Sequence, residues 1–169
     1  MKAELIYNRC FMIIQVTSIK QLDICLDIIH KSFQTVADEF NLTTENCPSH
    51  TAFMLIKKLI TKFENNAPMF LYKYNDCYAG YFSLSVSEKD VELNNLAVLP
   101  EYRHLGIGRE LVNYVLAYSK NIGANKIKIG IIEDNTVLKK WYEQFDFVHT
   151  GTKRFSHLPF TVGFMELRI

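Results

Sequence analysis

The chain has 169 residues, a length that fits one domain able to bury roughly two thirds of the surface its unfolded form exposes. Its 19 basic and 18 acidic residues are interspersed, which predicts no nucleic-acid partner and no anionic membrane surface. Residues 1–11 lack the apolar core of a signal peptide, and no apolar run is long enough to span a bilayer. We therefore expect one cytoplasmic domain over residues 1–169, monomeric or homodimeric, with residues 1–11 as a dispensable extension.

The cysteines give no sign of a metal site or a disulfide framework. Cys10, Cys25, Cys47 and Cys77 have no short paired spacing, and the five histidines do not bracket them as zinc ligands would. Reduced thiols and no bound metal are expected. Cys47 and His50 are close enough in sequence to act as nucleophile and base, but two such residues beside a proline usually reflect chance composition.

The first elements are a strand and a helix. Residues 12–16 read as a strand, and Ser18 with Gln21 forms a capping box for a helix that runs to about Phe33. Residues 34–47 are polar and weakly periodic, which predicts a long connection. Such a segment is either an ordinary surface loop or a binding element.

A second helix and a hairpin follow. The helix is expected to begin near Ser49 and to bury apolar residues at helical spacing. Two aromatic-rich runs, residues 69–74 and 77–88, are joined at Asn75-Asp76, which is the composition of a tight antiparallel turn.

The next strand, residues 91–99, changes the phase of its apolar positions. Apolar side chains occupy odd positions before Asn94-Asn95 and even positions after it. Because strands have a period of two, one face stays buried only if an extra residue is inserted there, which predicts a β-bulge. The alternative is a strand buried on both faces with two tolerated asparagines.

A glycine-rich turn connects this strand to a helix that runs to Ile122 and is capped by Gly123. Unpaired amides at a helix start, with the small Gly106 and Gly108, form a cradle for a phosphorylated ligand. The P-loop pattern fails because no lysine follows Gly108, and the dinucleotide pattern fails because Leu111 is large.

The last third of the chain completes a mixed α/β fold. Residues 126–132 read as a strand reached by a helical crossover, and are therefore expected to lie parallel to residues 91–99. Residues 135–145 read as a short helix, and residues 147–151 and 161–168 as final strands.

The glycine turn and its surroundings resemble a known family. The pattern Arg103-x-x-Gly106-x-Gly108 follows Pro100-Glu101-Tyr102, and Asn135 and Tyr142 lie downstream. Together they resemble the acetyl-CoA loop of the GNAT superfamily of N-acetyltransferases. The resemblance implies a mostly antiparallel central sheet with helices on both faces and a splayed parallel pair, the fourth and fifth strands, that binds the cofactor.

The same resemblance implies the contacts with acetyl-CoA. The pantetheine arm and acetyl carbonyl are expected on the main chain of Leu96, Ala97 and Val98. Asn135 is expected on the pantetheine arm, although an asparagine there is also a good N-cap. The diphosphate is expected on the main-chain amides of His104, Leu105, Gly106, Ile107, Gly108 and Arg109, and Arg103 is also expected among the cofactor-binding residues.

Two residues are candidates for proton transfer. The resemblance implies that Tyr142 protonates the departing thiolate, although a tyrosine beside Trp141 is also compatible with plain core packing. Glu92 is the candidate base for the attacking amine, and a solvent-facing glutamate is the alternative. Weaker candidates for substrate contact are Tyr81, Asn94 and Tyr102.

The implied activity is direct transfer of acetyl from acetyl-CoA to a primary amine of a small molecule or peptide in a ternary complex. The alternative is a non-catalytic module that senses acetyl-CoA or binds a partner. Acylation of an aminoacyl-tRNA is disfavoured by the balanced charge. We expect residues 34–50 and 152–160 to frame the acceptor site. Two positions depart from the family pattern: Leu138 replaces a small residue and Asp146 replaces a glycine.

Overall fold

The computed structural model describes residues 11–169. The expected extension lies outside the described residues, except for Phe11. Phe11 is the first residue of strand β1 (Phe11–Gln15), and its ring stacks on Tyr72 with centroids 5.6 Å apart. Strand β1 thus begins one residue before the predicted start at Met12, and Phe11 packs on the domain.

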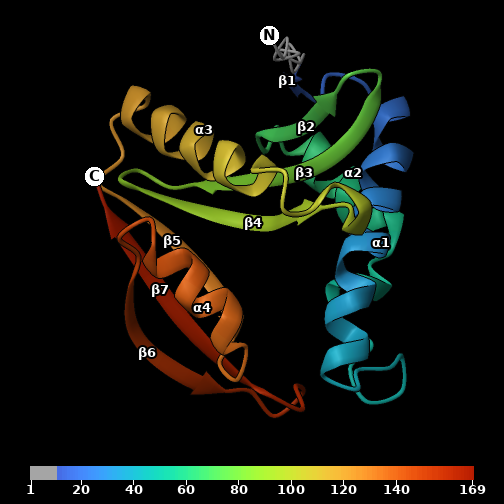
Figure 1. The fold of residues 1–169 in the computed structure, drawn as a ribbon, viewed down its shortest axis with the longest axis vertical. Helices are drawn as coiled ribbons and strands as arrows, with labels where there is room; N and C mark the ends of the chain where they lie inside the picture. Colours follow the sequence, from blue (N-terminus) through green and yellow to red (C-terminus); the bar gives the residue numbers. More distant parts are fainter. Residues whose placement is uncertain (1–10) are drawn as a thin grey trace, which may run out of the picture.

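The strands of residues 11–169 form one sheet in the order β1-β2-β3-β4-β5-β7-β6 (Figure 1). The neighbouring strands pair antiparallel except β4 and β5, which pair in parallel. This confirms the predicted mixed sheet with one parallel pair. The strands after β1 are β2 (Met69–Tyr74), β3 (Cys77–Val86), β4 (Asp90–Val98), β5 (Lys126–Ile132), β6 (Val148–Arg154) and β7 (Thr161–Arg168).

Helices cover both faces of the sheet. On one face, α3 (Ile107–Asn121) and α4 (Thr136–Glu143) pack on a core that includes Phe82, Val91 and Met165. On the other face, α1 (Leu22–Glu39) and α2 (Ile56–Glu64) pack on a second core that includes Leu71 and Tyr81. Figure 1 shows α3 along the β3–β4 side and α4 over β5 and β7.

The first helix is longer than its sequence predicts. It begins beyond the predicted capping box at Ser18, which starts a 3-10 turn, and it continues to Glu39 instead of ending at Phe33. The expected connection over residues 34–47 is therefore wrong in its first part. Ala37 is fully buried in a cluster that includes Ala52 and Ile132, and this tertiary packing extends the helix through a polar stretch.

The second helix begins later than predicted. Residues Thr51–Phe53 form a separate 3-10 turn, and α2 starts at Ile56. The chain is extended at Met54, whose carbonyl lies 2.8 Å from His30 Nε2 of α1. This contact with α1 separates what the sequence pattern reads as one helix.

The hairpin and the end of α3 agree with their predictions. Asn75, in the turn between β2 and β3, has φ +53°, and Gly123 has φ +74°. The Gly123 amide donates to Lys120 O at 3.1 Å and the Ala124 amide to Ser119 O at 3.0 Å, which is a Schellman cap. Helix α3 ends at Asn121, one residue before the predicted end at Ile122, which is 42% exposed.

No helix within residues 11–169 is both long enough and apolar enough to cross a membrane.

Candidate active site

Strand β4 contains the predicted bulge. The register between β3 and β4 shifts by one residue between Tyr81↔Ala97 and Ser83↔Asn94, and Asn95 has φ +52°. The bulge reverses the faces of the strand, so the apolar side chains before and after it reach the same core. These side chains are Val91 and Leu93 before the bulge and Leu96 and Val98 after it.

Strands β4 and β5 separate beyond a short paired region. Their parallel pairing joins Asp90 to Lys126 and ends at Glu92 and Lys128, whereas β5 continues beside β7 to Ile132. From Leu93 onward the edge of β4 that faces β5 has no strand partner within the described chain. This is the predicted splayed pair.

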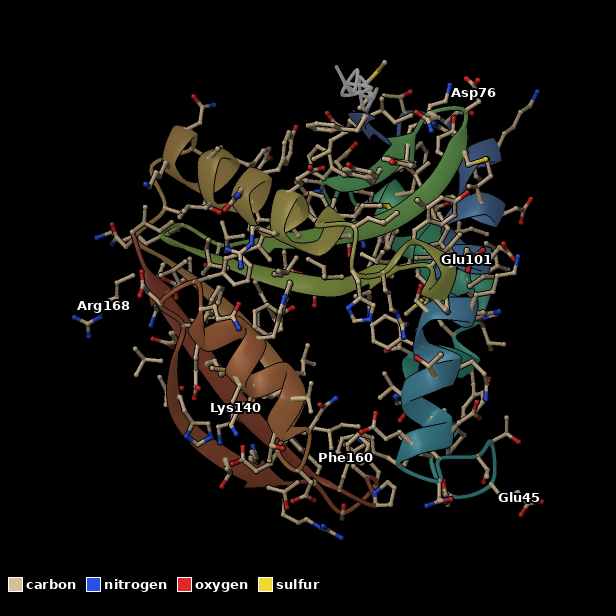
Figure 2. All side chains as sticks on the ribbon, in the orientation of Figure 1. Glu45, Asp76, Glu101, Lys140, Phe160 and Arg168 are labelled. Carbon is tan, nitrogen blue, oxygen red and sulfur yellow. The ribbon has the colours of Figure 1, made fainter. Side chains whose placement is uncertain are left out.

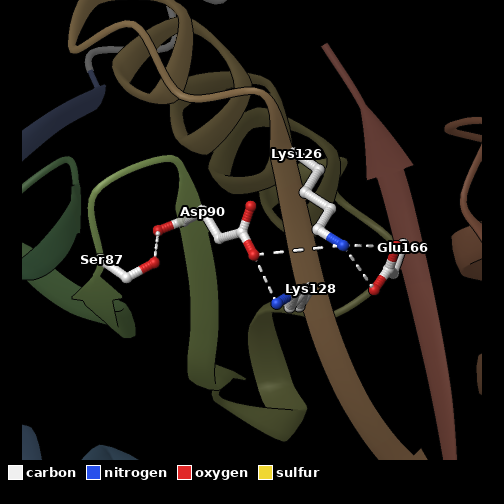
Figure 3. A network of polar contacts seen from close by, with 5 residues as sticks. All are labelled: Ser87, Asp90, Lys126, Lys128 and Glu166. Atoms are coloured by element: carbon white, nitrogen blue, oxygen red, sulfur yellow. Dashed lines mark hydrogen bonds and ion pairs between the residues drawn. The ribbon is translucent and has the colours of Figure 1, made fainter.

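An ion-pair network holds the closed end of this pair (Figure 3). Asp90 of β4 lies 2.5 Å from Lys128 Nζ and 4.0 Å from Lys126 Nζ, both on β5. Lys126 also lies 3.1 Å from Glu166 of β7, and Ser87 Oγ donates to Asp90 O at 3.1 Å. The nearby lysines lower the pKa of Asp90, chiefly through the hydrogen bond from Lys128. The network joins β4, β5 and β7 at the point from which β4 and β5 diverge.

The register decides which main-chain groups face the open edge of β4. The Leu99 amide donates to Ala79 O at 2.9 Å, and Ala97 pairs with Tyr81, so these residues direct their main chain toward β3. Alternate residues point to opposite edges, which leaves Leu96 and Val98 facing β5. Of the three predicted pantetheine contacts, Ala97 thus has its main chain engaged within the sheet.

The side chain of Arg103, which the sequence suggests as a contact with the cofactor, bonds to other parts of the protein. Its guanidinium donates to Val98 O at 3.2 Å, to Thr35 Oγ1 at 3.0 Å and to Ser32 O at 2.9 Å. Burial lowers the pKa of this guanidinium. The side chain ties the end of β4 to α1, so Arg103 positions the site from within the protein.

The turn into α3 presents unpaired main-chain donors. His104 and the N-cap Gly106 have φ of +63° and +87°, and no side chain caps the helix. The first helical bond runs from the Glu110 amide to Gly106 O at 3.1 Å. The amides of Ile107, Gly108 and Arg109 consequently have no acceptor among the described residues, which is the arrangement that binds anions at helix starts.

Gly108 is in close contact with α4. A Cβ placed on it lies 3.0 Å from Cζ2 of Trp141, a tight contact that would require the indole to shift by a few tenths of an ångström. Arg109 stacks over the Phe145 ring at 4.9 Å and donates to Gln144 Oε1 at 3.3 Å. The turn and α4 are thereby packed together, and Arg109 is held beside the turn.

Helix α4 carries two predicted residues. Asn135 is its N-cap and accepts a hydrogen bond from the Leu138 amide at 3.0 Å, which makes the capping interpretation correct. Tyr142 is 6% exposed and packs edge-on against Trp141 and Phe147, with centroids 4.8 and 5.3 Å away. Burial raises the pKa of Tyr142, so the phenol stays protonated at neutral pH, as an acid must be before it donates.

Glu92 lies on the opposite face of β4 from Tyr142, at the last residue paired with β5. Its side chain is exposed.

The three weaker candidates for substrate contact lie in different environments. Tyr81 is fully buried, and Tyr102 packs edge-on against Tyr74 at 6.0 Å. Asn94 donates to Ser85 Oγ at 2.9 Å on the face that carries Glu92.

Lys62 of α2 is a polar residue beside the bulge that sequence reasoning did not identify. Its Nζ donates to Ser83 Oγ at 2.9 Å and to Asn95 Oδ1 at 3.3 Å. Asn95 in turn donates to Thr51 Oγ1 at 3.4 Å. In the sequence, a lysine of an amphipathic helix that contacts the sheet looks the same as a lysine that faces solvent. The cluster can therefore be recognised only from the fold.

The structure also shows the surroundings of the cysteines and of the two chain segments expected to frame the acceptor site. Burial raises the pKa of Cys25 to about 12, which keeps that thiol unreactive. Within residues 11–169 no group of side chains is arranged to hold a metal ion. Phe160 (labelled in Figure 2) and Leu158, from the β6–β7 connection, pack against the cluster that contains Ala37 and Cys47, so the two segments adjoin.

Comparison with known proteins shows the family of the chain. The sequence profile of the acetyltransferase (GNAT) family matches residues 33–147. An uncharacterized N-acetyltransferase of Mycobacterium tuberculosis is 32% identical over 68 residues, which span 40% of this chain and 44% of that protein. The chain thus matches less than half the length of this relative.

Solved structures share the fold over almost the whole chain. The ribosomal-protein-S18-alanine N-acetyltransferase of Escherichia coli has a TM-score of 0.76 at 18% identity, covering 95% of this chain and 94% of that one. The PaiA N-acetyltransferase of Thermoplasma acidophilum, in complex with coenzyme A, has a TM-score of 0.75 at 18% identity and covers 95% and 99%. An Elizabethkingia anophelis GNAT acetyltransferase with acetyl-CoA bound has a TM-score of 0.66 at 19% identity and covers 94% and 98%. With its profile match over two thirds of the sequence, the chain belongs to the GNAT family of acetyltransferases.

Proposed function

We propose that this protein transfers the acetyl group of acetyl-CoA to a primary amine by direct attack in a ternary complex. The observation that carries the proposal is the open edge of β4 leading directly into the unpaired amides at the start of α3. A linear ligand with an anionic middle and an amide-containing arm fits such a surface. Two neighbours of the same fold have acetyl-CoA or coenzyme A bound.

The residues of this chain fit coenzyme A in two places. The amides of Ile107, Gly108 and Arg109 would hold the diphosphate, because three unpaired donors and the helix dipole favour an anion there. The main chain of Leu96 and Val98 would pair with the pantetheine arm as a missing strand does. Val98 O is already held by Arg103, so its amide is the group left for this pairing.

Proton transfer is assigned to the two faces of β4. Glu92 would take the proton of the attacking amine, directly or through water, because its carboxylate is exposed on the α1–α2 face. Tyr142, on the α3–α4 face, would protonate the sulfur as the carbon–sulfur bond breaks. A main-chain donor at the bulge would polarise the acetyl carbonyl, and orientation of the two substrates supplies much of the rate.

The described cysteines and the sheet support two coarser proposals. Cys25, Cys47 and Cys77 are unpaired, which favours a reducing, cytoplasmic compartment. The sheet of residues 11–169 is continuous, which favours one domain for the chain.

Calorimetry with acetyl-CoA and a thiol-release assay over a panel of amines test the proposed function. We expect binding of acetyl-CoA in the micromolar range and amine-dependent release of thiol. Binding without turnover would favour the sensing module, and absence of any heat on folded protein would refute the assignment of the cofactor site.

A further inference from the structure

The cluster around Lys62 adjoins the candidate transfer site. Lys62 bonds to Asn95, which immediately precedes Leu96, one of the residues whose main chain faces the open edge of β4. Ser83, the other partner of Lys62, pairs with Asn94 across the β3–β4 register. The ammonium therefore lies over the bulge, on the face of the sheet that α1 and α2 cover.

The charge of Lys62 is not neutralised by the protein. Both of its hydrogen-bond partners are neutral oxygens, and within residues 11–169 no carboxylate lies within ion-pair distance of it. Other lysines near the site differ: Lys128 pairs with Asp90 and Lys126 with Glu166. Burial lowers the pKa of Lys62, with Glu92 acting in the opposite direction at longer range. A half-buried ammonium with one unused N–H costs free energy, and a bound anion would offset that cost.

The position of Lys62 relative to Glu92, the candidate base, suits an acceptor that carries a second polar group besides its amine. Glu92 pairs with Ser85 of β3, while Lys62 bonds to Ser83, two residues along the same face. Two residues along a strand correspond to about 7 Å. An acceptor whose amine approaches Glu92 can thus place a second group, a few bonds away, beside Lys62.

We propose that Lys62 is a specificity-determining residue that binds an anionic group of the acceptor close to its amine, an inference that rests on the proposed function. Amino acids and amines that carry a carboxylate or a phosphate have this chemistry. Polyamines do not, because their second cation would lie near an uncompensated ammonium.

Matched acceptor pairs test this inference. The assay compares kcat/KM for amino acids with that for their amides, for phosphoethanolamine with ethanolamine, and includes spermidine. The amide of an amino acid is the weaker base and has more neutral amine at a given pH, so a preference for the acid must come from the protein. We expect a preference of about tenfold or more for at least one anionic partner. The carboxylate and phosphate arms identify which anion is bound.

Variants assign the preference to Lys62. Lys62→Met is expected to reduce the anionic-to-neutral ratio to near one, and Lys62→Arg to retain most of it. Lys57→Met is the matched control, because Lys57 is exposed on α2 and, unlike Lys58, is not among the charges that act on Lys62. Because the readout is a ratio of two acceptors on one protein, a general loss of stability in Lys62→Met leaves the comparison valid.

The outcomes separate this inference from the proposed function. If acetyl-CoA binds and no anionic acceptor is preferred over its neutral partner, or the preference survives in Lys62→Met, the role of Lys62 is refuted while the cofactor site stands. If acetyl-CoA does not bind to the folded protein, both are refuted.

Discussion

Tyr142 illustrates how a single buried side chain supports two interpretations at once. It packs in the core against Trp141 and Phe147, yet it lies on the helix that contacts Gly108. Its raised pKa keeps the phenol protonated in the folded protein but also makes it a weaker acid than a thiol, so burial alone does not favour donation to the thiolate. Core packing and acid catalysis are still compatible for this residue.

The substitution Tyr142→Phe separates these contributions. It keeps the ring and its packing, so acetyl-CoA affinity, measured by calorimetry, should be unchanged. Removal of the proton donor should lower kcat by about 10²-fold or more. Tyr114→Phe, on α3 against Phe70, is the control and should retain full activity. An unchanged kcat in Tyr142→Phe would assign the residue to packing alone.

His50 gives the fold a dependence on pH. Its Nδ1 accepts the Ala52 amide at 3.3 Å, which caps the 3-10 turn at Thr51, and the side chain is 9% exposed. Burial lowers the pKa of His50 below its ordinary 6.5. The folded state then binds this proton less readily than the unfolded state, so the contribution of His50 is complete above about pH 6.5 and is lost as the pH falls.

Thermal unfolding between pH 7.5 and pH 5.5 measures this effect. The wild-type Tm should fall over this range, by about 2–4 °C for each kcal/mol lost. His50→Asn retains a capping oxygen but cannot titrate, so its Tm should fall less. His157→Asn, at an exposed site, should behave as the wild type does. Equal slopes for wild type and His50→Asn would contradict the assignment.

At the level of elements, the packing of α4 against the glycine turn couples the two. A methyl group at Gly108 would meet Trp141 at 3.0 Å, whereas a methyl group at Gly123 meets nothing within 4 Å. Gly123 does, however, have φ +74°, where a side chain is strained by roughly 1–2 kcal/mol.

The pair Gly108→Ala and Gly123→Ala exploits this difference. Gly108→Ala should displace Trp141 and weaken acetyl-CoA binding by about tenfold or more. Gly123→Ala should lower Tm by a few degrees and leave the affinity unchanged. Calorimetry and thermal unfolding of both variants check the expectation. Equal affinities for the two would show that the turn tolerates movement of α4.

Elements with a strong local signal were predictable from sequence, and those fixed by distant contacts were not. The bulge at Asn95 shows as a slip in apolar phase, and the cap at Gly123 shows as a glycine after an amphipathic helix. The extension of α1 to Glu39 depends on Ala37 packing in one cluster with Ala52 and Ile132, which no local pattern records. The positions of Arg103 and Lys62 depend on contacts with other elements, so their partners could not be inferred from spacing.

For the molecule as a whole, the boundary at Phe11 is testable. The Phe11 ring stacks on Tyr72, and an aromatic pair contributes about 0.5–1.5 kcal/mol beyond its buried area. A chain that begins at residue 11 should therefore unfold in one transition with a Tm close to that of the full chain. Phe11→Ala in the full chain should unfold a few degrees lower. A large loss of Tm on removing residues 1–10 would show that they belong to the domain.

The chain has a single tryptophan, and Trp141 is the residue that contacts Gly108. Indole emission responds to its immediate surroundings, so the protein carries a built-in optical reporter at the turn that we assign to the diphosphate. Titration with coenzyme A can then be followed without any label, and rapid mixing can time the arrival of the nucleotide separately from chemistry.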